Sequence, residues 1–135
     1  MTHLLDTNVC IMHLRSKGVG PISSRLLQFT SHEVCLCSVV VAELIYGALR
    51  SQKVAKNAAE VQVFIGGISS LPFDNDAAQK HAEIRAHLSS LGTPIGPHDA
   101  LIAAIALANN LTLVTHNTSE FSRIPNLRLE DWQVP

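Results

Sequence analysis

Short apolar runs alternate along the chain with longer segments in which apolar residues recur at helical spacing. The short runs predict strands at residues 3–6, 33–37, 68–71, 111–115 and 127–129. The longer segments predict helices at 9–15, 22–30, 39–49, 54–65, 77–91 and 99–109, with Ser38 as a candidate N-cap and 72–76 as a loop. This alternation predicts a single α/β domain over residues 1–135, with a mostly parallel central sheet of about five strands and helices on both faces.

Composition supports one ordered domain and excludes several classes of protein. Hydrophobic residues make up 47% of the 135 residues and aromatic residues only 4%, which predicts an aliphatic core. A net charge of −1 gives no global attraction to nucleic acid. The longest apolar run, 100–108, falls far short of the roughly 20 residues that span a bilayer, and the N-terminus lacks the pattern of a signal peptide. We therefore expect a soluble cytoplasmic protein without a membrane partner.

Three acidic residues interrupt strongly apolar segments. Asp6 follows a predicted strand, Glu43 lies within an apolar helix, and Asp99 opens another one. An ionised carboxylate in apolar surroundings needs a compensating partner. Helix capping is an alternative explanation for Asp6 and for Asp99. It cannot explain Glu43, for which the alternative is an ion pair with a base such as Arg50 or Arg85.

Two further polar residues follow the fourth predicted strand, at Asn117 and Glu120. In a parallel sheet, residues that follow the carboxyl ends of strands share one crevice, so these two are expected near Asp6. Oxygen ligands of this kind suit Mg²⁺ or Mn²⁺. The remaining acids are assigned to loops or the tail (Asp74, Asp76, Glu130, Asp131) or to solvated positions (Glu33, Glu60, Glu83).

Four segments in order along the chain carry a family resemblance: LLDTN at 4–8, VAELIYGA at 41–48, IGPHDALIAA at 95–104 and LVTHNTSEF at 113–121. Together they resemble the PIN-domain ribonucleases, specifically the VapC type of bacterial toxin. The resemblance implies that Asp6, Glu43 and Asp99 hold Mg²⁺ or Mn²⁺. Asn117 falls where many PIN domains have Asp, and Glu120 matches a nearby acid that some members use. Whether one metal or two bind is left open by this fourth position.

Other polar residues near these positions are candidates for supporting roles. Thr7, Asn8 and Thr115 are expected to form hydrogen bonds around the carboxylates. Possible substrate contacts are Arg85, His98 and His116, although a purely local structural role is the alternative for each histidine.

The resemblance also implies an activity and a set of partners. It implies an endoribonuclease toxin that hydrolyses a structured RNA such as tRNA with water as the nucleophile. It further implies a homodimer and a VapB-type antitoxin, with operator DNA bound only through that antitoxin. The alternative is a catalytically weak binding module that acts in a toxin–antitoxin repressor complex on DNA.

Overall fold

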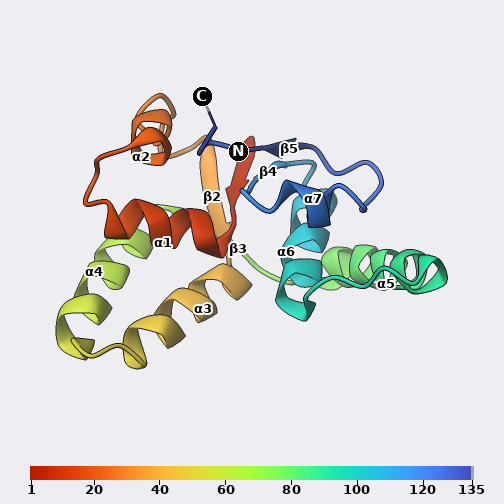
Figure 1. The fold of residues 1–135 in the computed structure, drawn as a ribbon, viewed down its shortest axis with the longest axis horizontal. Coiled ribbons are helices and arrows are strands. Elements are labelled where there is room, and N and C mark those ends of the chain that lie inside the picture. Colours follow the sequence, from red (N-terminus) through yellow and green to blue (C-terminus); the bar gives the residue numbers. More distant parts are fainter. Residues whose placement is uncertain (135) are drawn as a thin grey trace.

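A computed structural model describes residues 1–134 of the chain. Its five strands form one parallel sheet, as predicted, and their order in the sheet is β3-β2-β1-β4-β5 (Figure 1). The strands are β1 (His3–Leu5), β2 (Val34–Cys37), β3 (Ser69–Leu71), β4 (Thr112–Val114) and β5 (Leu129–Glu130). β1 lies at the centre, where Leu4 stands opposite Cys35 of β2 and Leu113 of β4. All five strands therefore end at one edge of the sheet.

Seven helices connect the strands of the described chain and fall into two groups (Figure 1). They are α1 (Thr7–Arg15), α2 (Pro21–Leu26), α3 (Ser38–Leu49), α4 (Val54–Gly66), α5 (Asn75–Leu91), α6 (Pro97–Ala108) and α7 (Thr118–Phe121). α1 packs against α2 and α3, and α3 against α4, on one side of the sheet, while α5 packs against α6 on the other. The two groups meet where α3 contacts α6.

The core is mainly aliphatic and centres on β1, β2 and β4. Leu4, Leu36 and Leu113 are fully buried, and α6 adds a run of buried small and branched residues over 102–106. The three cysteines are buried free thiols. Within residues 1–134, no helix is both long and apolar enough to cross a membrane. Close packing of α6 against its neighbours fixes the position of this helix, which carries Asp99 in its first turn.

Several elements differ from the prediction, and the helix predicted at 22–30 ends at Leu26. Ser38 is the first residue of α3 rather than its N-cap, because Cys37 occupies the extended cap position. α5 begins within the predicted loop, since the Asp74 carboxylate accepts a hydrogen bond from the Ala77 N–H at 2.9 Å and caps the helix. The short helix α7 was not predicted at all. Asp74 therefore ends the loop as a helix cap, whereas Asp76 lies in the first turn of α5 rather than in a loop.

Candidate active site at the carboxyl edge of the sheet

Four carboxylates from distant parts of the chain lie near one another at this edge. Asp6 follows β1, Glu43 lies in α3, Asp99 lies in the first turn of α6 and Glu120 lies in α7. Burial is the largest cause that raises the pKa of Asp99 to about 6, followed by the charges of Glu120, Asp6 and Glu43 in that order. The structure thus brings together all four acids that the sequence singled out.

Asp6 is the most buried of the four, at 5% exposure. Its Oδ1 accepts a hydrogen bond from the Val9 N–H at 2.9 Å, so it does cap α1. Burial nevertheless raises the pKa of Asp6, and the opposing effects of the Thr115 hydroxyl and the Val9 N–H do not cancel it. Asp6 is therefore both the N-cap of α1 and a buried carboxyl whose pKa lies above its ordinary value.

Glu43 is half-buried and is held by two neighbours from other elements. The Thr7 hydroxyl donates to Glu43 Oε1 at 3.0 Å, and His98 Nδ1 lies 3.5 Å from Oε2. Within the described chain, Glu43 forms no ion pair with Arg50 or Arg85, and the base that lies beside it is His98. Arg50 instead donates to the Tyr46 hydroxyl at 3.2 Å.

Asn117 and Glu120 act together rather than as competitors for one position. Asn117 Nδ2 donates to Glu120 Oε2 at 2.6 Å, and the Gly96 N–H donates to Glu120 Oε1 at 3.2 Å. The backbone N–H of Asn117 donates to the Thr115 hydroxyl at 3.0 Å. Gly96 was not predicted to take part, because its contribution comes from the backbone. These bonds tie Glu120 to the loop that precedes α6.

The other predicted supporting residues lie in different surroundings. Thr115 is fully buried between Asp6 and Asn117, whereas Asn8 is exposed on α1 and makes no side-chain hydrogen bond within residues 1–134. His98 is 64% exposed beside Glu43. The structure therefore surrounds the carboxylates with Thr7, Thr115 and His98, but gives Asn8 no such contact.

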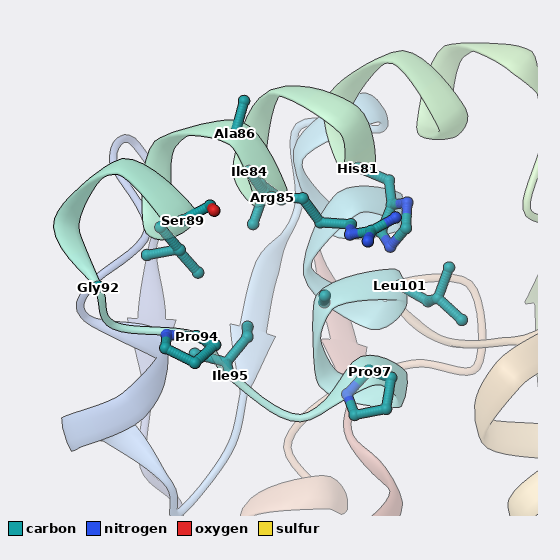
Figure 2. A pocket seen from close by; sticks show the side chains of 12 residues that line it. His81, Ile84, Arg85, Ala86, Ser89, Gly92, Pro94, Ile95, Pro97 and Leu101 are labelled. Carbon is teal, nitrogen blue, oxygen red and sulfur yellow. The ribbon is translucent and has the colours of Figure 1, made fainter.

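Arg85 lies on α5 and faces a different space from the carboxylates. It lines a cavity of about 890 Å³ with His81 of the same helix and Leu101 of α6 (Figure 2). Burial, and then the charge of Arg85, lower the pKa of His81. None of the four carboxylates lines this cavity. The structure does not bring Arg85 to the acids, and its contact with substrate remains a prediction.

Two acids near the C-terminus have partners that the sequence did not predict. Glu130 belongs to β5, and its carboxylate lies 3.0 Å from His3 Nε2 and 3.6 Å from Arg25 Nη2. Asp131 follows β5, as Asp6 follows β1, and its Oδ2 lies 2.9 Å from His116 Nδ1. The negative charge of Asp131 also raises the pKa of Asp6. Its place after a strand was the signal that could have identified it.

The donor set at this edge fits a hard divalent cation. It consists of carboxylate, amide and hydroxyl oxygens, and within residues 1–134 no lysine or arginine forms an ion pair with Asp6, Glu43, Asp99 or Glu120. Burial, and after it the charges of neighbouring carboxylates, raise the pKa values of Asp6 and Asp99, and a bound cation would offset both effects. In the described part of the chain, no group of three or more His, Cys, Asp or Glu side chains is placed so that it could hold a metal ion as it stands.

The chain is similar to known proteins over nearly its whole length. The PIN domain family matches residues 3–127. The chain is 42% identical over 130 residues to the "tRNA(fMet)-specific endonuclease VapC" of Shigella flexneri, which covers 96% of each chain. It is 36% identical over 132 residues to "Ribonuclease VapC2" of Rickettsia felis, which covers 98% of each. Among solved structures, DNA-bound VapBC from Salmonella typhimurium matches with a TM-score of 0.92 and 40% identity, over 98% of both chains.

Proposed function

The chain belongs to the PIN-domain family, and from this premise we propose that it is a metal-dependent endoribonuclease toxin of the VapC type. The observation that carries the proposal is the group of four carboxylates at the carboxyl edge of the sheet. Burial, and then the charges of the other three, raise the pKa of Asp99, and no basic side chain among the described residues other than His98 pairs with any of the four. Carboxylates that lower the stability of the fold in this way are typical of an active site, where their chemistry is needed for function.

The proposed reaction is hydrolysis of an RNA phosphodiester bond. Water attacks the phosphorus, the bond to the 3′ oxygen breaks, and that oxygen takes up a proton, which leaves 5′-phosphate and 3′-hydroxyl ends. A bound Mg²⁺ or Mn²⁺ supplies positive charge that activates water and stabilises the transition state. Asp6, Glu43 and Asp99 would hold the cation, Glu120 and Asn117 would complete its surroundings, and Thr7 and Thr115 would orient the carboxylates.

Cleavage of RNA by the purified protein, with Mg²⁺ or Mn²⁺ and with EDTA, tests this function. We expect cleavage only with the metal, and a loss of at least about a hundredfold in Asp6→Asn and Asp99→Asn. Glu83→Gln, an exposed acid on α5, is the matched control and is expected to keep full activity. Metal-independent cleavage, or normal activity of Asp6→Asn, would contradict the proposal. Inactive wild-type protein that still assembles with an antitoxin on DNA would support the alternative of a binding module.

A VapB-type antitoxin is the proposed protein partner. Two open grooves share the side chains of Leu14, Lys17 and Glu60, so they form one continuous surface over α1 and α4. One end carries the exposed Val63, and the other end reaches Glu43. A partner segment bound along this surface would reach the carboxylates.

We propose that operator DNA is bound through this partner, and that the toxin itself forms a homodimer.

The proposed substrate is a structured RNA such as a tRNA, the class named for the Shigella relative. Such a substrate places the protein in the cytoplasm. Induction of the chain followed by sequencing of new 5′-phosphate ends would identify the RNA and the cleaved bond. Cleavage confined to one loop of one tRNA is the expected result, and dispersed cuts in many messages would contradict it.

A further inference from the structure

His116 and Asp131 form a hydrogen-bonded pair at the edge of the candidate active site. They follow the neighbouring strands β4 and β5, where Val114 stands opposite Glu130. His116 lies between Thr115, which faces Asp6, and Asn117, which donates to Glu120. Both members of the pair therefore stand at the same edge as the carboxylates.

The hydrogen bonds of Asp131 fix the orientation of the His116 ring. Asp131 Oδ1 accepts from the Gln133 N–H at 2.9 Å, which leaves Oδ2 facing His116 Nδ1 at 2.9 Å. A carboxylate can only accept, so Nδ1 carries the hydrogen. In the neutral ring, Nε2 is then an acceptor with a free lone pair. The pair thus presents one oriented acceptor nitrogen.

His116 is exposed and Asp131 is mostly buried, as expected if His116 contacts a ligand and Asp131 holds it in place. The Asp131 side chain is 17% exposed, whereas His116 is 60% exposed. The pair of His3 and Glu130 shows the opposite arrangement, because His3 is 13% exposed and packs against Phe29 and Trp132. The His3 ring is therefore buried in the fold. The His116 ring is instead held by Asp131 at Nδ1 and is exposed to solvent on its other side.

We propose that His116 Nε2 accepts a hydrogen bond from a ribose 2′-hydroxyl of the bound RNA, with Asp131 as its positioning residue. This inference rests on the proposed ribonuclease function. Phosphate oxygens are acceptors and cannot donate to Nε2, whereas every ribonucleotide carries a 2′-hydroxyl donor. Hydrolysis by water does not consume that hydroxyl, so it is available for recognition. The pair would then help the enzyme to distinguish RNA from DNA.

The test combines protein variants with single 2′-deoxy substitutions at successive nucleotides around the cleaved bond of an RNA oligonucleotide. In the wild type, one substitution is expected to lower kcat/KM about five- to tenfold, as for the loss of one hydrogen bond. His116→Ala should lose a similar factor on the unmodified RNA and become insensitive to that substitution. His116→Gln keeps an acceptor oxygen and should restore part of the sensitivity. Asp131→Asn should reduce the sensitivity of kcat/KM to the 2′-deoxy substitution. In a protein that already carries His116→Ala, Asp131→Asn should not lower kcat/KM further.

Controls separate this inference from the proposed function. His87→Ala removes an exposed histidine on α5 and should behave as the wild type. Thermal unfolding of each variant checks that the fold is kept. If the wild type cleaves RNA but His116→Ala keeps the full 2′-deoxy effect, the proposed role of His116 is wrong, while the proposed ribonuclease function is still supported. Sensitivity to changes in a base instead would assign Nε2 to a base donor and overturn the proposal. A wild type without any metal-dependent cleavage would overturn both.

Discussion

Asp99 links the proposed function to stability at the scale of one side chain. Its pKa is about 6 in the folded protein against an ordinary 3.8, so the native state binds more protons than the unfolded chain between these values. Stability should therefore fall as pH rises from about 4 to 6. After allowance for partial exposure, we expect Asp99→Asn to raise the free energy of unfolding by about 1 kcal/mol at pH 7.5 without metal. Urea unfolding in EDTA measures this difference.

The same titration supplies its own control. At pH 4.5 the wild-type carboxyl is mostly protonated, so the advantage of Asp99→Asn should largely disappear. Glu83→Gln, far from the carboxylates on α5, should change stability little at either pH. An Asp99→Asn protein that is less stable than the wild type at pH 7.5 would show that the charge is already compensated.

Thr7 tests whether a neutral hydroxyl orients Glu43. Thr7→Val keeps the side-chain volume but removes the donor at 3.0 Å from Glu43 Oε1, which leaves that carboxylate freer to turn. We expect the Mg²⁺ concentration for half-maximal RNA cleavage to rise about tenfold, as for other residues behind metal ligands. Thr7→Ser keeps the hydroxyl and should stay near the wild type. Equal defects in both variants would point to packing of the methyl group instead.

At the scale of elements, the sequence predicts what is continuous and apolar. β1, β2 and α6 were predicted because their apolar runs stand out from the polar residues that flank them, and three acids stood out against those runs. The four-residue α7 is too short to carry a period. The strand predicted at 127–129 ended before Glu130, so Asp131 was not recognised as the residue that follows β5. The hydrogen bond from Gly96 to Glu120 depends on tertiary packing that no local pattern encodes.

Helix α6 gives a prediction at the same scale. Ala104 is fully buried in α6, which packs against α5 and β4. Ala104→Leu adds volume to a filled core and should lower the free energy of unfolding by about 1–3 kcal/mol. Because Asp99 lies on the same helix, cleavage activity should also fall. Ala82→Leu on the exposed face of α5 is the matched control and should unfold near the wild-type urea midpoint.

For the whole molecule, parallel strands and their order explain how residues so distant in sequence meet. β1 lies between β2 and β4, so the segments that leave these three strands emerge side by side. Sequence alone could suggest this edge, because it follows from parallel topology. It could not give the distances between the carboxylates or show that Asn117 donates to Glu120. Those depend on how the two helical groups meet across α3 and α6.

The groove over α1 and α4 gives a prediction for the whole assembly. Val63 is 79% exposed there, where the proposed antitoxin would cover it. Val63→Glu would place a charge in an apolar contact, so we expect antitoxin affinity to fall at least about tenfold, measured by calorimetry. RNA cleavage by the free toxin should be unchanged, because Val63 does not contact the carboxylates. Leu91→Glu on α5, at an apolar residue that is 58% exposed, should leave affinity unchanged. Equal weakening by both substitutions would contradict this placement of the partner.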